Sequence, residues 1–189
     1  SEFEWTGKPT SLFCVVAGNI SDDLEVLQIA LTKLSDAYRT VLFIDGSLEH
    51  VHLEDYEQRV AALKELCDSV PNVIYLHNHV VILNNIAFVG SNGWYGNRKE
   101  ISQAEDIDYL DQYRSDDLAY LSHTVKSLQT HRDVEKIIMV TNSIPSDYLA
   151  FNSPNVDLPP ELNPATSLLF DHKNKITKWL FGTNDITVD

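Results

Sequence analysis

The feature that most constrains the fold of this chain is the alternation of short apolar segments with helical patterns. Buried strands are predicted at residues 11–18, 40–44, 73–76, 136–140 and 177–181, each bounded by Gly, Pro, Asn, Asp or Ser. Helices are predicted at residues 23–37, 54–68 and 116–132, where apolar side chains recur every three or four positions. Such alternation is typical of an α/β protein with a largely parallel central sheet.

Other segments depart from this simple alternation. Residues 80–83 and 86–89 predict a hairpin, because Asn84-Asn85 between them tolerates the positive φ of a tight turn. Residues 90–115 are predicted to be irregular, with an acidic later half that is compatible with helix. Residues 146–165 are predicted to be loop, and 168–172 a short helical segment. With no repeat and no linker, residues 1–189 are expected to form a single domain.

Composition narrows the classes of function. Hydrophobic residues make up 43% of the 189 residues, enough for a core. The net charge is −14, with 14 basic and 28 acidic residues, which argues against a nucleic-acid clamp and against an anionic membrane surface. The apolar runs are too short to cross a membrane, no signal pattern opens the chain, and Cys14 and Cys67 are expected to be reduced core thiols. A cytoplasmic location is therefore expected.

Polar residues follow the predicted strands at points that should lie together. In open α/β sheets, sites form at the carboxyl ends of the strands. The strand ends carry Gly18-Asn19, Gly46-Ser47-Leu48, Asn142-Ser143 and residues 182–185. These positions are the predicted site.

The same strand ends, in this order, resemble the motifs of the calcineurin-like metallophosphoesterase family. VVAGNISDD resembles the family's Gly-Asp-x-x-Asp motif, VLFIDGSLEH its Gly-Asn-His-Glu/Asp motif, IIMVTNSIPS its Thr-His-His-x-Pro motif, and KWLFGTND its Gly-His-x-His motif. NVIYLHNHVVILNNIAFVGSNGWYG is similar to the hairpin and Gly-rich segment between them. The resemblance covers about residues 11–186 and rests on the ordered series, since no single motif is specific.

The resemblance implies an αββα sandwich of two mixed sheets flanked by helices. It also implies a centre of two metal ions held by Asp, His and Asn, which bind a phosphate and activate a water molecule. The family's first motif, Asp-x-His, should lie on a strand before residue 11. No such strand is predicted there, which leaves open a sandwich that lacks its first strand.

The chain departs from the family at the positions of the metal ligands. Asn19 stands in place of the bridging Asp, Ser47 in place of the ligating Asn, and Leu48 in place of the His that contacts the phosphate. The remaining departures are Asn142 for a ligating His, and Thr183 and Asp185 for the last two His. The family residues that are kept are Gly18, Asp22, Gly46, Glu49, Thr141, Pro145 and Gly182.

We therefore expect no catalytic residues, no bound metal and no cofactor, in a pseudoenzyme domain that serves as a protein-binding, scaffolding or structural module. Its vestigial cleft would comprise Asn19, Asp22, Ser47, Leu48, Glu49, Asn142, Ser143, Thr183, Asn184 and Asp185. A protein partner or self-association is expected, with no nucleic acid and no membrane. Candidate partner-binding residues are Trp94, Tyr95 and Arg98, in the long irregular segment, where the alternative is packing of the aromatic residues against a sheet edge.

Two alternatives stay open. The first is a divergent metal-dependent phosphoesterase that binds one or two divalent ions such as Mn or Mg. Its ligands would be drawn from Asp22, Asp45, Glu49, His50, His52 and Asp185. Without such a metal site, these histidines are loop residues and the carboxylates are solvated. His77 and His79, at period-two spacing, could likewise be a metal pair; the alternative is a surface or packed role. The second alternative is a nucleotide or small-ligand sensor that uses the polar cleft.

Overall fold

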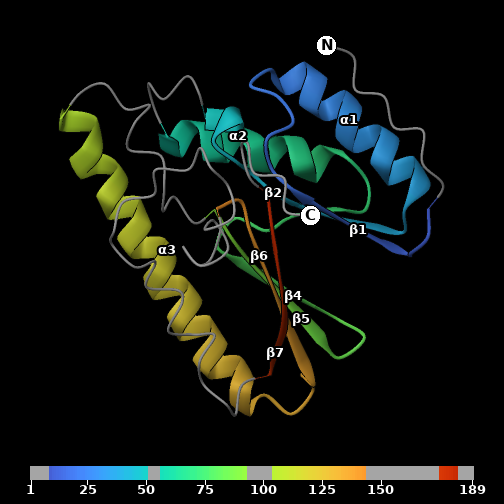
Figure 1. Ribbon diagram of the computed structural model, residues 1–189. Coiled ribbons are helices and arrows are strands. Elements are labelled where there is room, and N and C mark those ends of the chain that lie inside the picture. Colours follow the sequence, from blue (N-terminus) through green and yellow to red (C-terminus); the bar gives the residue numbers. More distant parts are fainter. Residues whose placement is uncertain (1–8, 51–55, 93–103, 144–174, 183–189) are drawn as a thin grey trace, which may run out of the picture.

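The computed structural model describes residues 9–50, 56–92, 104–143 and 175–182. Its helices and strands alternate along the chain (Figure 1). In chain order the elements are β1 (Phe13–Ala17), α1 (Leu24–Ala37), β2 (Thr40–Ile44), the 3₁₀ turn η1 (Leu48–His50), α2 (Tyr56–Ser69), β3 (Val73–Tyr75), β4 (His79–Leu83), β5 (Ile86–Ser91), α3 (Ala104–Thr130), β6 (Lys136–Thr141) and β7 (Ile176–Phe181).

The described strands form two sheets. The first has the order β1-β2-β3 and is parallel throughout. The second has the order β4-β5-β6-β7, in which β4 and β5 pair antiparallel and the other pairs are parallel. The second sheet is therefore mixed, as the sequence predicted, whereas the described strands of the first sheet run in one direction.

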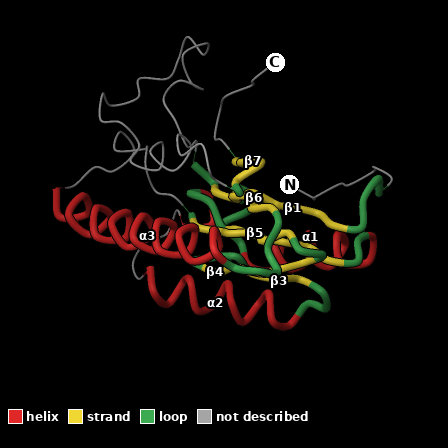
Figure 2. The backbone as a smooth tube through the Cα atoms, turned by 90° about the horizontal axis from the view of Figure 1, so that it is seen from below, coloured by secondary structure: helices red, strands yellow, loops and turns green. Residues whose placement is uncertain are grey.

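Three hydrophobic clusters define the layers. One lies between the first sheet and the helices α1 and α2, and includes Leu27, Leu63 and Phe43. A second lies between α3 and the second sheet, where Leu121 and Met139 meet. The third joins the two sheets. In Figure 2 the strands occupy the middle of the molecule and α2 runs along one side. The fold is thus an α/β sandwich of two sheets flanked by helices, which confirms the predicted class.

Strand β2 shows how the sequence produces these layers. Val41 and Phe43 point toward the helices, and Leu42 and Ile44 toward the second sheet. All of these side chains are buried, so a continuous apolar run, rather than an alternating one, is the pattern that this central strand requires. Complete burial of each large side chain contributes about 1.5–3 kcal/mol.

Local sequence signals account for the start of α1 and for the β4–β5 turn. The side chain of Asp23 caps α1 by accepting a hydrogen bond of 2.8 Å from the backbone N–H of Glu25. Asn84 and Asn85 have φ of 50° and 64° in the β4–β5 turn, so the predicted hairpin is confirmed.

The third helix begins earlier than its predicted bound at residue 116. The acidic later half of residues 90–115 was expected to be compatible with helix, and α3 does begin at Ala104 and continue to Thr130. Its first turns are acidic, and the positive end of the helix dipole favours acidic residues there, a signal that apolar periodicity does not detect. The predictions for 93–103, 146–165 and 168–172 fall outside the described residues.

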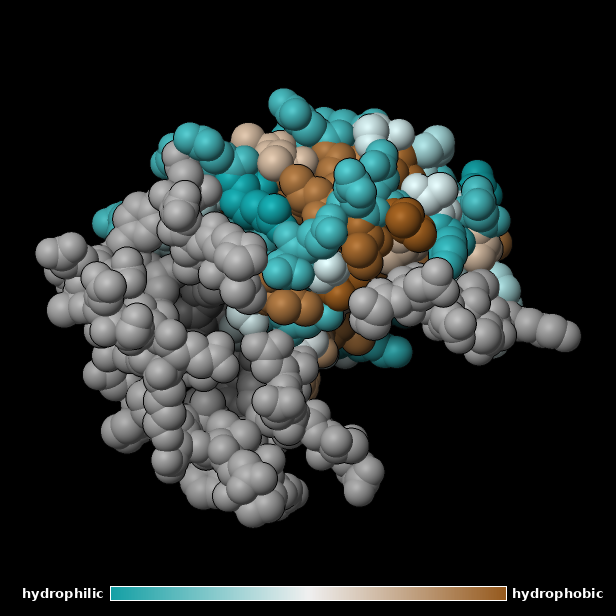
Figure 3. Space-filling view, turned by 90° about the horizontal axis from the view of Figure 1, so that it is seen from above, coloured by the Kyte–Doolittle hydropathy of each residue, from teal (hydrophilic) through white to brown (hydrophobic). Residues whose placement is uncertain are grey.

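The described surface mixes polar and apolar side chains. On the face shown in Figure 3, separate hydrophobic residues emerge among hydrophilic ones. The large apolar side chains that are most exposed are Leu12, Ile29 and Ile82, which come from three different elements or their flanks. In the part of the chain that the structure describes, no helix is both long and apolar enough to span a bilayer.

Candidate functional site

The carboxyl ends of β1, β2, β6 and β7 come together around Asn142. The side-chain Nδ2 of Asn142 donates a hydrogen bond of 2.7 Å to the carbonyl oxygen of Ala17, at the end of β1. A Cβ atom on Gly18 or Gly46 would lie 2.7 Å or 2.5 Å from the same nitrogen. A Cβ atom on Gly182 would collide with the Ala17 carbonyl oxygen. The glycines at these strand ends therefore leave just enough room for the amide.

Asn19 joins the first two of these strand ends. Its backbone adopts φ of 62°, a conformation that Asn tolerates better than most residues. Its side-chain Oδ1 accepts hydrogen bonds from the backbone N–H of Leu48 at 3.0 Å and from the hydroxyl of Ser47 at 3.3 Å. A neutral amide thus fixes the β2 loop at the position where the metallophosphoesterase family that the sequence resembles has a metal-bridging carboxylate.

Glu49 ties the same two loops together with a charge. Its carboxylate is fully buried and accepts backbone N–H groups from both sides. Oε2 accepts from Asn19 at 2.8 Å and from Gly46 at 2.7 Å, while Oε1 accepts from Ile20 at 2.6 Å and from Ser21 at 3.3 Å. Backbone N–H groups converging on a carboxylate offset the cost of burying it. Glu49 is therefore used to hold the loops.

A second buried carboxylate lies beneath the site. Asp45, which directly follows β2, is fully buried. Its Oδ2 lies 2.5 Å from Nε2 of His50 and 2.9 Å from Nδ2 of Asn92, and its Oδ1 lies 3.3 Å from Nδ1 of His77. Nδ2 of Asn92 also donates to the Asp45 carbonyl at 3.0 Å. We call Asp45, His50, His77 and Asn92 the Asp45 cluster.

The contacts in the Asp45 cluster shift the pKa values of Asp45 and His77. Burial alone would raise the pKa of Asp45, but the hydrogen bonds and charges of His50 and His77 outweigh it and hold that pKa well below its usual range. Burial alone would lower the pKa of His77, yet the hydrogen bond and charge of Asp45, with a contribution from Asp117, raise it above its usual value. Asp45 is thus ionised at neutral pH.

Aromatic rings enclose the cluster. Tyr56 stacks on His50 with ring centres 4.8 Å apart, and Tyr75 stacks on His77 at 5.7 Å. Burial, followed by the charge of Asp45, raises the pKa of Tyr75 well above its usual value. The interpretation of Asp45 and Glu49 as solvated carboxylates is therefore wrong. His50, expected to be a loop residue, lies in the turn η1 and is buried.

The remaining predicted residues are dispersed or lie outside the description. Asp22 is exposed, and its carbonyl accepts a hydrogen bond of 2.5 Å from Arg59. Ser143 is half-buried, and its backbone N–H donates to the Asn92 carbonyl at 3.3 Å. Ser47 and Leu48 are half-buried beside Asn19. Outside the described residues lie Thr183, Asn184, Asp185, His52, Trp94, Tyr95 and Arg98.

Sequence reasoning missed two members of the Asp45 cluster. His77 was paired with His79, but His79 is exposed on β4, while His77 turns inward to Asp45. Asn92 follows β5 and was not singled out. The available signal was an Asp directly after a buried strand together with polar residues directly after neighbouring strands.

In the described residues, the site does not fit the two-metal centre of the metallophosphoesterase family that the sequence resembles. No group of three or more His, Cys, Asp or Glu with a geometry for a metal ion occurs among them. Asn19 Oδ1 receives the Leu48 N–H, and Asn142 presents its nitrogen, which is a donor, to its neighbours. His50 and His77 direct their near nitrogens at Asp45. No catalytic step through a metal follows from this arrangement.

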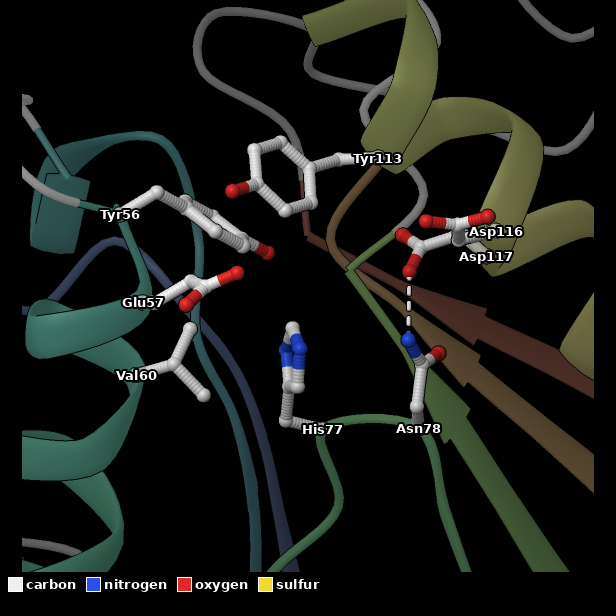
Figure 4. A pocket seen from close by; sticks show the side chains of 8 residues that line it. All are labelled: Tyr56, Glu57, Val60, His77, Asn78, Tyr113, Asp116 and Asp117. Carbon is white, nitrogen blue, oxygen red and sulfur yellow. Dashed lines mark hydrogen bonds between the residues drawn. The ribbon is translucent and has the colours of Figure 1, made fainter. Parts of the chain in front are cut away.

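A pocket of about 260 Å³ lies next to the Asp45 cluster, between α2, the β3–β4 connection and α3 (Figure 4). His77 reaches it from the β3–β4 connection, and Tyr56 and Tyr113 cover one side with ring centres 4.0 Å apart. Acidic residues come from both helices. The lining residues are Tyr56, Glu57, Val60, His77, Asn78, Tyr113, Asp116 and Asp117.

The two sheets flanked by helices are consistent with a metallophosphoesterase-like sandwich. The chain is similar to the crystal structure of phosphopantetheinyl hydrolase PptH from Mycobacterium tuberculosis, with a TM-score of 0.53 and 13% sequence identity over 76% of this chain. It spans 62% of that structure's length, and at this identity the similarity concerns the fold alone. No family model matches the chain.

One curated sequence shows a short similarity. It is the uncharacterized protein L509 of Acanthamoeba polyphaga mimivirus, 29% identical over 66 residues, which are 33% of this chain and 24% of the viral protein. The chain therefore spans less than two thirds of the length of either protein, 62% of PptH and 24% of the viral protein.

Proposed function

We propose that this chain is a metallophosphoesterase-like domain without a metal centre, which serves as a protein-binding or structural module. One observation carries the proposal: the amides at two positions of the family's ligands hold the strand ends together. Asn19 binds the Leu48 N–H at 3.0 Å, and Asn142 binds the Ala17 carbonyl at 2.7 Å. Side chains that satisfy buried backbone groups in this way leave those groups unpaired if they turn toward a metal ion.

The charges of the site support the same conclusion. Two adjacent dications need a bridging anion, and both buried carboxylates near the site have other partners. Glu49 accepts backbone N–H groups, and Asp45 binds His50, His77 and Asn92. Leu48, at the place of the family's phosphate-contacting His, can neither donate a proton nor ligate. Loss of a general acid alone typically lowers a rate by about 10²–10⁴.

The alternative is a divergent metal-dependent phosphoesterase. It is considered because the fold is similar to that of a hydrolase, PptH. Elemental analysis of the purified protein, joined to turnover assays on generic phosphomonoester and phosphodiester substrates with added Mn or Mg, separates the two functions. We expect substoichiometric metal and no turnover above buffer. Two stoichiometric ions, with hydrolysis that Asn19→Ala abolishes, would overturn the proposal.

A conservative pair of variants sharpens this experiment. Asn19→Asp keeps an acceptor for Leu48 N–H and Ser47 Oγ and supplies the family's carboxylate, so the loop should keep its shape. Leu48→His supplies the family's imidazole. We expect that neither variant alone gains metal or activity, because the other ligand positions still carry Ser47 and Asn142. A gain of either property by one substitution would show that the metal centre is nearly intact.

A further inference from the structure

Two dipeptides of the sequence are prone to the same side reaction. The chain contains Asp45-Gly46 and Asn92-Gly93, and no other Asp-Gly or Asn-Gly pair. Where Gly follows Asp or Asn, no side chain hinders the approach of its backbone nitrogen to Cγ of the preceding residue, so a succinimide ring forms readily. The fold brings the first residues of the two pairs together, since Nδ2 of Asn92 lies 2.9 Å from Oδ2 of Asp45.

The reaction at Asn92 exchanges its amide for a carboxylate. The nitrogen of Gly93 bonds to Cγ of Asn92, the bond from Cγ to Nδ2 breaks, and Nδ2 leaves as ammonia with the proton of the Gly93 amide. A water molecule then opens the succinimide at either of its carbonyl carbons, which gives aspartate or isoaspartate at position 92. Overall, one water is consumed, one ammonia is released and the chain gains one negative charge.

The native contacts of Asn92 oppose this reaction. Its Nδ2 donates to the carbonyl oxygen of Asp45 at 3.0 Å as well as to the carboxylate, and the residue is 1% exposed. Its carbonyl oxygen accepts from the backbone N–H of Asn142 at 3.1 Å and of Ser143 at 3.3 Å. The side chain and the backbone are both held, and water is excluded. Deamidation therefore requires the Asp45 cluster to open.

The other pair is held as firmly and is chemically slower. The N–H of Gly46, whose nitrogen would attack Asp45, donates to Oε2 of Glu49 at 2.7 Å. The carboxylate of Asp45 is buried and bound by the other members of the cluster. An ionised carboxylate is also a poor electrophile, whereas an amide can lose ammonia. Asn92 is therefore the residue of the two that reacts first when the cluster opens.

We propose that Asn92 is a deamidation site that reacts only when the Asp45 cluster opens, and that its product keeps the cluster from closing again. Aspartate at position 92 would put a second carboxylate where the amide now lies 2.9 Å from the carboxylate of Asp45. Two like charges in a buried space disfavour the closed state. In isoaspartate, an extra backbone carbon also displaces the carbonyl group that binds Asn142 and Ser143. The change is thus one-way, whether or not the chain binds a metal.

The first test compares deamidation in the folded and the unfolded chain. The unmodified protein is incubated at pH 7.5 with and without guanidinium chloride, and mass spectrometry of peptides follows position 92. We expect the reaction without denaturant to be at least about tenfold slower, because its rate follows the population of the open form. Equal rates in the two conditions would overturn the proposed protection.

Two controls isolate the chemistry of the ring. Gly93→Ala is measured only in denaturant, where the fold plays no part, and should slow deamidation at position 92. Asn72 and Asn78, which precede Val73 and His79, lack a following Gly and should react far more slowly in the same unfolded sample. Reaction of Asn92 at the rate of these residues, or an unchanged rate in Gly93→Ala, would exclude the succinimide route.

The second test measures what the product does. Asn92→Asp carries the new charge, and Asn92→Ala removes the amide without adding one. At pH 7.5 we expect the unfolding equilibrium constant of Asn92→Asp to exceed that of Asn92→Ala by at least about tenfold. The difference should shrink as the pH falls and one of the two carboxylates takes up a proton. Equal stability of the two variants at pH 7.5 would overturn the one-way change.

A refolding experiment covers the case in which Asn92→Asp does not fold. The unmodified chain is deamidated in part in denaturant, refolded by dilution, and separated into folded and unfolded fractions. We expect the folded fraction to contain at least about tenfold less of the modified residue than the unfolded fraction. Equal amounts in the two fractions would show that the cluster closes around the product, and the proposal would fail.

Discussion

Nε2 of His50 lies 2.5 Å from Oδ2 of Asp45, and neither side chain is exposed to solvent. This contact connects the end of β2 to the turn η1, five residues further on. It is the centre of the polar interior beneath the strand ends, because His77 and Asn92, which follow β3 and β5, reach the same carboxylate. The shape of the β2 loop therefore depends on a buried charge.

Replacement of Asp45 should be strongly destabilising. Asp45→Ala removes the shared acceptor of His50, His77 and Asn92 and leaves their polar groups in a buried space. We expect a loss of about 3–5 kcal/mol in the free energy of unfolding, measured by urea denaturation. Asp68→Ala is the control, since its pair with Lys64 is largely exposed and should contribute less than about 1 kcal/mol. Similar losses in both variants would contradict the assigned role of Asp45.

The same cluster predicts a pH dependence of stability. The pKa of His77 is raised above its ordinary value of 6.5 in the folded chain, so its contribution is complete below pH 6.5 and is lost as the pH rises through the higher folded value. The pKa of Asp45 is lowered from 3.8, so its contribution is present above pH 3.8 and is lost as the pH falls through the folded value. The cluster should stabilise the fold most between these limits.

Two measurements check this dependence. The free energy of unfolding of the unmodified chain should fall from pH 5.5 to pH 8.5, and His77→Gln should reduce that difference. In Asp45→Asn, the pKa of His77, followed by NMR, should move down, because burial then acts without the opposing charge. An unchanged pKa in this variant would mean that Asp45 is not its main partner.

Local sequence patterns predicted most of the elements, and tertiary packing decided the residues that they missed. Strand β2 was predicted at its observed bounds because a run of buried apolar residues stops at Asp45-Gly46. His77 and His79 have the spacing of side chains on one face of a strand. Asn78, with φ of 42°, turns the chain between them, so β3 ends at Tyr75 and His79 begins β4 in the other sheet.

The candidate site was predicted in outline and missed in detail for a related reason. Strand ends can be aligned from sequence, and Asn19, Ser47, Leu48 and Asn142 do lie together. The burial of Asp45 depends on groups that are remote in sequence, His77 after β3 and Asn92 after β5. No local pattern states which of several polar residues after neighbouring strands will face one another.

Removal of one charge should loosen the link between the first two strand ends. In Glu49→Gln, one carboxylate oxygen becomes an NH₂ group, which faces N–H donors of the backbone. Two of the N–H groups of Asn19, Ile20, Ser21 and Gly46 then lose their acceptor, at about 1–3 kcal/mol each. Thermal denaturation and hydrogen exchange of these amides measure the loss. Glu65→Gln, exposed on α2, should change stability by less than about 0.5 kcal/mol.

The tight packing of amides between the strand ends predicts that Gly46 tolerates no side chain. Its φ is not in the left-handed region, so a substitution tests space rather than backbone conformation. In Gly46→Ala the new Cβ would lie 2.5 Å from both Asn142 Nδ2 and Asn19 Oδ1. Since these amides are held by hydrogen bonds, we expect a loss of about 1–3 kcal/mol from overpacking.

A double-mutant cycle separates this clash from a general effect of alanine in the loop. Asn142→Ala alone should be destabilising, because the carbonyl of Ala17 loses its 2.7 Å donor. In the double variant the shortened residue 142 makes room for the Cβ on residue 46. The loss of stability in the double variant should therefore be smaller than the sum of the two single losses, by at least about 0.5 kcal/mol. Simple additivity would show that residue 142 has room to move. The strand ends would then be loose enough for Asn142 to turn, which would reopen the question of a ligand at this position.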